Sequence, residues 1–112
     1  MSHELIYHVA LASDWAVAQR TGEYAVSTLG RSLSEEGFIH ASRADQWAGV
    51  LARFYADVTD PLVLLVVDRR LLRSEVRDEA VPDSDETFPH VYGPIDVGAV
   101  VEVRALDASR DQ

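Results

Sequence analysis

Hydrophobic and polar positions follow three clear patterns along the chain. They alternate through Leu5–Leu11, which is the period of a β-strand with one buried face. Residues 62–67 are apolar throughout and predict a central strand covered on both faces. Over residues 43–57, apolar side chains recur three and four positions apart, which predicts a core-facing helix. Its stripe consists of Trp47, Val50, Leu51, Phe54, Tyr55 and Val58.

Capping residues indicate where the helices begin and end. Ser13 is placed to cap a first helix that runs to about Arg20, and Gly22 follows where a left-handed residue commonly ends a helix. Ser42 and Asp45 have the S-x-x-D spacing of a capping box for the longer helix. Two main helices are therefore expected.

Shorter elements are expected in the rest of the chain. Pro89 cannot donate a ladder hydrogen bond, so its strand should lie at a sheet edge or a bulge. The fold class predicted is α+β: one domain, 1–112, with its core at about 5–106, a frayed tail at 107–112 and a small, mostly antiparallel sheet. The other extended segments are 24–26, 37–41, 76–81, 88–92 and 99–106, with a loop up to residue 36 and a helical turn at 69–72.

The amino-acid composition argues against several classes of function. A net charge of −9 argues against binding of duplex DNA through a broad basic face. The absence of cysteine excludes disulfides, thiolate metal clusters and thiol redox chemistry. All ten basic residues are arginine, so there is no lysine for a Schiff base or a Walker motif. No apolar run approaches the roughly 20 residues that span a bilayer, and the start lacks a basic leader, so a cytoplasmic protein without a membrane partner is expected.

Histidines are the leading candidates for chemistry. His8, His40 and His90 each lie in a different predicted strand, and the three imidazoles can converge in one cleft with Phe38 or Tyr92 at its wall. Each could instead be a hydrogen-bonded core or edge residue without chemistry. Three neutral imidazoles could also form a zinc site, but no pair has a local ligand spacing, and no metal is expected.

Other polar residues have a functional and a simpler interpretation. Arg43 stands at the predicted start of the longer helix and could bind a phosphate together with free backbone N–H groups, or it could simply face solvent. Glu79 and Glu102 are expected to face solvent. Trp15 and Trp47 are expected in the core.

Three segments carry a family resemblance. The runs IYHVALASDWAVAQRTGEY, EGFIHAS and FPHVYGPI together resemble the bacterial domain-of-unknown-function family nine-five-two over about residues 5–106. That family is similar in turn to the ADP-ribosyltransferase superfamily, especially its RNA 2′-phosphotransferase branch. The resemblance implies a split fold, with the cleft between two small antiparallel sheets.

The resemblance also implies NAD as the cofactor. His8 would hold a ribose hydroxyl, and the segment with His40 and Ser42 would line the nicotinamide side. Phe38, Arg43 and Tyr92 complete the expected nucleotide-binding set, and the three histidines form the expected catalytic set.

Cleavage of the nicotinamide–ribose bond also requires stabilisation of positive charge, usually by a late-strand glutamate or by arginines. His90 and Tyr92 stand where that acidic residue is sought. We therefore expect nucleotide binding with slow or absent NAD turnover. The alternatives are a non-catalytic module that binds a nucleotide, ADP-ribose or a modified RNA end, and a metal-dependent hydrolase that uses the three histidines. A protein acceptor for a transferase is left open.

Overall fold

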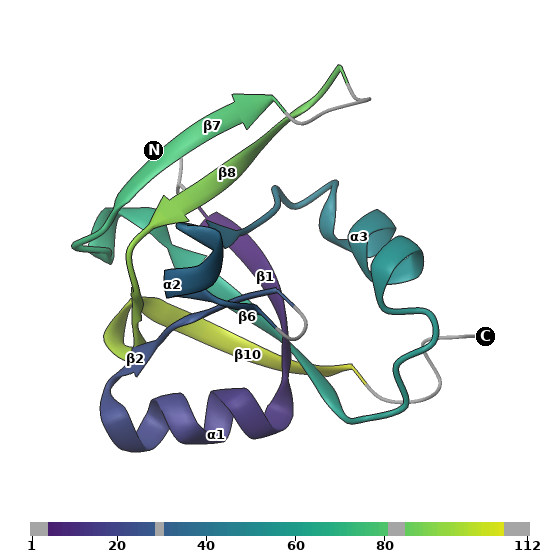
Figure 1. The fold of residues 1–112 in the computed structure, drawn as a ribbon, viewed down its shortest axis with the longest axis horizontal. Coiled ribbons are helices and arrows are strands. Elements are labelled where there is room, and N and C mark those ends of the chain that lie inside the picture. The colour runs from purple at the N-terminus through teal and green to yellow at the C-terminus, as the bar shows by residue number, and fades with distance from the viewer. Residues whose placement is uncertain (1–4, 29–30, 81–84, 107–112) are drawn as a thin grey trace.

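Strand β6 (Leu62–Asp68) is the centre of the main sheet. In the computed structural model, which describes residues 5–28, 31–80 and 85–106, β6 lies antiparallel between β1 (Leu5–Leu11) and β10 (Val100–Leu106) (Figure 1). Its alternate residues enter two different cores, Leu65 and Val67 on one face and Leu64 and Val66 on the other. A strand covered on both faces is thus confirmed, although its neighbours are antiparallel.

Helix α1 (Ala12–Thr21) covers one face of this sheet with Trp15 and Ala18. Gly22 ends the helix at a φ of 93°, as expected for a left-handed glycine. The prediction that Ser13 caps the helix is wrong, because β1 runs directly into α1 and the helix already begins at Ala12. The backbone N–H of Ala12 donates to the carbonyl of Pro61 at 2.9 Å, so the start of the helix is held by the neighbouring loop.

Helix α3 (Trp47–Phe54) lies against the other face and is shorter than predicted. Ser42 is not a cap, because its backbone pairs with β1; instead, the Arg43 N–H donates to Oε1 of Gln46 at 2.8 Å in the turn before the helix. Trp47, Val50 and Leu51 pack partly buried on this core. Phe54 is 63% exposed, so the prediction that it packs on the sheet is wrong.

The second sheet has the order β5 (Ile39–His40), β8 (Thr87–Tyr92), β7 (Glu75–Ala80), all antiparallel. The prediction of an edge position for the Pro89 strand is wrong, since β8 is central. The Pro89 carbonyl accepts from the Ala41 N–H at 3.0 Å, just beyond the end of β5. The N–H that proline lacks would point to the same side, where the ladder already ends, so no interior hydrogen bond is lost.

The serine-rich segment is more ordered than the predicted loop. It forms β3 (Val26–Thr28), β4 (Arg31–Ser32) and the single-turn α2 (Leu33–Glu36). Ser32 and Glu35 form a capping box for α2, whereas the box predicted at Ser42 and Asp45 for the longer helix does not form. The remaining elements are β2 (Glu23–Tyr24), which pairs with β9 (Ile95–Asp96), and two 3₁₀ turns, η1 (Arg69–Leu71) and η2 (Val97–Ala99).

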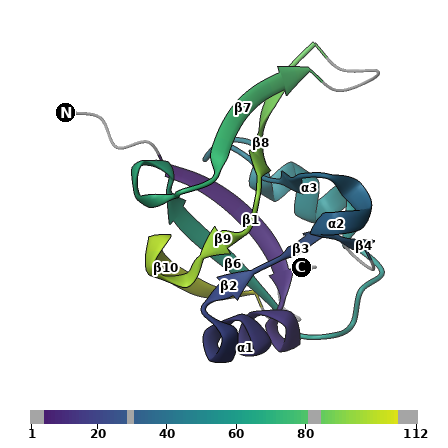
Figure 2. The ribbon, with the colours of Figure 1, turned by 60° about the vertical axis from the view of Figure 1, so that its left-hand side comes forward.

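The two sheets meet at one backbone bridge. The Tyr7 N–H donates to the Ser42 carbonyl at 2.8 Å, and the Ser42 N–H donates back at 2.7 Å. The β7–β8 hairpin extends from this junction at the end of the molecule opposite α1 (Figures 1 and 2). The result is a small α+β domain with antiparallel sheets and three helices, in which β1, the end of β5 and α3 surround the functional residues.

Candidate functional site

A pocket of about 350 Å³ opens between β1, the end of β5 and α3. This volume lies near the lower end of the usual range of about 300–1,000 Å³ for small-molecule sites. Aromatic and aliphatic side chains dominate the lining, with few polar groups among them, which is also typical of such sites. The lining residues are Tyr7, His8, Val9, Ser27, His40, Ala41, Ser42, Val50, Phe54, Tyr55 and Phe88.

His8 is a buried, neutral imidazole with two protein partners. Its Nδ1 donates to the His40 carbonyl at 2.5 Å, which leaves Nε2 as the acceptor for the Tyr24 hydroxyl at 3.2 Å. Burial lowers the pKa of His8 to about 4; the hydrogen bond to the His40 carbonyl opposes that effect, and the nearby His40 ring adds to it. His8 therefore joins β1 to β5 and β2 at the wall of the pocket.

His40 is the more accessible of the two histidines that line the pocket. Its side chain is 42% exposed, and Nε2 lies 3.5 Å from Oε2 of Glu36. Burial, and then the neighbouring His90, lower the pKa of His40, while Glu36 opposes the shift. Both effects favour a neutral ring at neutral pH, which can donate through one nitrogen and accept through the other.

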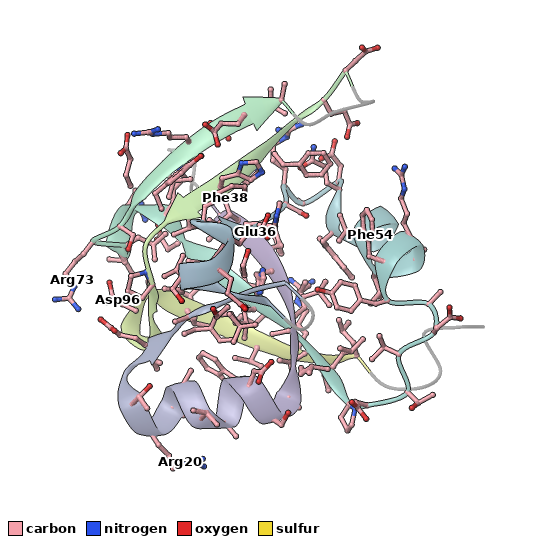
Figure 3. All side chains as sticks on the ribbon, viewed as in Figure 1. Arg20, Glu36, Phe38, Phe54, Arg73 and Asp96 are labelled. Carbon is pink, nitrogen blue, oxygen red and sulfur yellow. The ribbon has the colours of Figure 1, made fainter. Side chains whose placement is uncertain are left out.

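His90 lies behind His40 and is not among the lining residues. The two rings are 5.1 Å apart, and Phe38 stacks on His90 at 4.3 Å between ring centroids. Phe38 contacts Tyr92 as well, at 5.3 Å. Figure 3 shows Phe38 close to Glu36, on the segment that leads from α2 into β5. Phe38, His90 and Tyr92 thus form an aromatic support behind His40.

A carboxylate that was expected to face solvent holds this support together. Oε1 of Glu79 accepts from His90 Nδ1 at 2.8 Å and from the Tyr92 hydroxyl at 2.5 Å. These two hydrogen bonds, that of Tyr92 first, lower the pKa of Glu79. His90 Nε2 is buried and has no hydrogen-bond partner among the described residues.

The prediction for Glu79 is therefore corrected. The alternation of β7 and β8 places Glu79 and His90 on one face, a relation that becomes readable only when the hairpin register is known. Glu102, in contrast, is exposed and pairs with Arg104 at 2.9 Å, as its predicted position implied.

The sequence profile of a family described as "Protein of unknown function (DUF952)" matches residues 9–103. The chain is a DUF952 protein. The match falls within the span of the resemblance expected from the three sequence segments, and it confirms that family.

Solved structures of protein CC0527 from Caulobacter crescentus are similar to this DUF952 protein. A crystal structure is 30% identical with a TM-score of 0.79 and covers 93% of this chain and 87% of its own. A solution NMR structure is 30% identical with a TM-score of 0.72 and covers 94% of this chain and 88% of its own. No curated protein matches the chain.

The remaining expected site residues of this DUF952 protein lie around the pocket. Ser42 lines it, while Arg43, next in the chain, is exposed and donates from Nη1 to the Thr87 carbonyl at 2.7 Å. Thr87 precedes the lining residue Phe88, so Arg43 lies near the rim. The sequence does not single out Tyr7, Val9, Ser27 or Tyr55 for the site, because they come from β1, β3 and the end of α3, which are brought together only by the tertiary fold.

The geometry bears on two further classes of site, a metal centre and a membrane-spanning segment. Within residues 5–28, 31–80 and 85–106, no group of three or more histidine, aspartate or glutamate side chains is placed to hold a metal ion. The histidines do not share a centre, because His8 uses both nitrogens on protein partners and His90 uses Nδ1 on Glu79. The three-histidine hydrolase therefore gains no support. In the described part of the chain, every helix is too short or too polar to span a bilayer.

Proposed function

We propose that this DUF952 protein binds NAD, ADP-ribose or a related nucleotide, with the nucleoside part in the pocket between β1 and α3. The observation that carries the proposal is one pocket, lined by two neutral histidines and several aromatic residues. Aromatic faces suit a planar base, and neutral imidazoles suit ribose hydroxyls, which both donate and accept hydrogen bonds. The resemblance of the three sequence segments to ADP-ribosyltransferases, as inferred from the sequence, points to the same ligand class.

The size of the pocket limits how much of the ligand enters. At about 350 Å³ it suits a base with its ribose better than an entire dinucleotide. The phosphates then lie outside, at the rim near Arg43. An arginine there supplies the positive charge that a phosphate needs in a chain with a net charge of −9.

The histidines have different roles in this proposal. His40, with an exposed edge, contacts the ligand directly. His8 fixes the His40 backbone through the bond from Nδ1, and its Nε2 can serve a ribose hydroxyl only by exchange with the Tyr24 hydroxyl. Phe38, His90 and Tyr92 support His40 from behind. Of the three histidines expected to be catalytic, His40 then contacts the ligand directly, and His8 and His90 position it.

Turnover of NAD is slow or absent in this proposal. Cleavage needs negative charge beside the developing oxocarbenium ion. Glu79, the late-strand carboxylate of the cluster, already accepts two hydrogen bonds, and neither Glu79 nor Glu36 lines the pocket. The binding module is therefore the form of the function that the geometry supports best.

Calorimetry with ADP-ribose, NAD and an RNA end bearing a 2′-phosphate tests this proposal. Wild type should release heat with at least one of them, and His40→Ala should weaken binding by about 1–3 kcal/mol, because it removes a hydrogen-bond partner. Val17→Ala, on the exposed side of α1, is the control and should bind like wild type. Folded protein that gives no heat with any adenine nucleotide contradicts the proposal, and rapid release of nicotinamide from NAD contradicts the expected lack of turnover.

A further inference from the structure

The outer edge of β10 is an open strand edge with exposed valines. β10 ends the sheet order β1-β6-β10, and β6 is its only strand partner among the described residues. Val101 is 53% exposed and Val103 is 41% exposed. Natural proteins usually cover or blunt such an edge, because its unpaired N–H and C=O groups can pair with another chain.

The alternation of hydrogen bonds across the sheet identifies the groups that point outward. Tyr7 directs its N–H and C=O to Ser42, away from β6, so the next residue, His8, pairs with Leu65 of β6. Leu65 therefore faces β1 and not β10. Val103, opposite Leu65 on β10, must direct its own N–H and C=O to the open edge.

The sequence of β10 is complementary to itself when it is reversed about Val103. We propose that β10 pairs antiparallel with β10 of a second copy of this chain, on a twofold axis through Val103. Glu102 of each copy then lies opposite Arg104 of the other, and Val101 lies opposite Ala105. The two sheets become one continuous sheet across the axis, as an isologous dimer requires.

Charge complementarity is the observation that specifies a second copy as the occupant. Glu102 and Arg104 lie on one face of β10 and already pair within the chain, with Arg104 Nε 2.9 Å from Glu102 Oε2. Reversal places a positive charge opposite each negative one, whereas an antiparallel strand with the opposite order of charges would place like charges together. The exposed valines gain an apolar neighbour in the same arrangement.

The dimer should be weak and dependent on concentration. A shift in register between Val100 and Glu102 confines the regular part of β10 to Glu102–Leu106. An edge contact of this length falls below the roughly 1,000 Å² expected of a stable interface. The net charge of −9 on each copy also opposes association.

Sedimentation equilibrium over a wide range of protein concentration tests the proposal. The mass of wild type should rise from 12.4 kDa toward twice that value. Glu102→Arg and Arg104→Glu each place like charges across the axis and should raise the dissociation constant about tenfold or more. An equimolar mixture of the two variants should associate again, because their charges are complementary, and the double variant should associate by itself.

Val103→Pro is a second, backbone-directed variant. It removes the N–H that points to the open edge and leaves the hydrogen bonds with β6 in place, so the fold should be kept while the dimer is lost. Thermal unfolding by circular dichroism confirms that each variant is folded. Three results would overturn the proposal: wild type that stays at 12.4 kDa at every concentration, a dimer that persists in Val103→Pro, or single-charge variants that do not associate when mixed.

Discussion

Replacement of His8 by asparagine should flatten the dependence of stability on pH. The folded state lowers the pKa of His8 from 6.5 to about 4, mainly by burial, whereas the unfolded chain keeps the ordinary value. This difference corresponds to about 3–4 kcal/mol, at about 1.4 kcal/mol per pH unit. Because the folded-state pKa is the lower one, the contribution is fully present above pH 6.5 and is lost as the pH falls toward 4.

The asparagine variant preserves the contact that matters most at neutral pH. Its amide N–H can replace Nδ1 as the donor to the His40 carbonyl, while the acceptor for the Tyr24 hydroxyl is lost. At pH 7.5 we therefore expect His8→Asn to be less stable than wild type by about 1–3 kcal/mol. Toward pH 4 that difference should shrink or reverse. In wild type, unfolding lets the His8 imidazole take up a proton, which favours the unfolded state at low pH, and the variant lacks this imidazole.

Urea unfolding at a series of pH values between 7.5 and 4 measures this effect. Carboxylates such as Glu79 also titrate in this range, but they do so in both proteins and cancel in the difference. His40→Asn is the matched control, and it should change the slope less because the His40 side chain is 42% exposed. Parallel curves for wild type and His8→Asn would refute the reasoning.

Three further predictions concern the core, the carboxylate of the cluster and the rim. Leu65→Ala, at a fully buried position, should cost about 2–5 kcal/mol in urea unfolding, and Phe54→Ala under about 0.5 kcal/mol; equal costs would contradict the assigned burial. Glu79→Gln should lower the thermal midpoint more than Glu75→Gln, since Glu75 pairs with the exposed Arg77 whereas Glu79 accepts from the buried His90; the reverse order would argue against the Glu79 cluster. Arg43→Ala should weaken calorimetric binding of ADP-ribose but not of adenosine, and an equal loss for both would remove the phosphate from the rim.

Much of the framework follows from local patterns in the sequence. The alternation of Leu5–Leu11 and the apolar run at 62–67 predict β1 and the doubly covered β6, because burial on one face or on two leaves different periodicities. Gly22 is equally readable, since its left-handed φ suits glycine. The helix stripe predicts α3, although Tyr55 and not Phe54 is buried at its end.

The errors fall where a distant contact replaces a local one. Ser42 has the spacing of a helix cap, but its backbone N–H and C=O are hydrogen-bonded to Tyr7, which lies in another part of the chain. Proline predicts an edge strand, yet Pro89 occupies the central strand of its sheet. This is possible because the N–H that proline lacks would point toward the end of β5. Glu79 joins His90 only through the register of a hairpin. No short-range pattern carries these pairings.

The histidines show the same division. Their placement in three strands predicted a shared neighbourhood. In the structure, His8 is hydrogen-bonded to the backbone of His40, and the His40 ring contacts the His90 ring. Only His8 and His40 reach the pocket, because Phe38 and the β7–β8 hairpin enclose His90. Which face of an imidazole meets solvent depends on packing that the sequence does not record.

The bridge between Tyr7 and Ser42 makes one wall of the pocket stiff and leaves the other able to adjust. Two backbone hydrogen bonds and the adjacent bond from His8 to the His40 carbonyl join the sheets within two consecutive residues of β1. Separation of the sheets would break all three at once. The opposite wall contains the exposed Phe54 ring, which turns without such a cost. A ligand of the proposed kind would therefore enter past the exposed Phe54 ring and meet a rigid wall, and selectivity for its shape would reside on the histidine side.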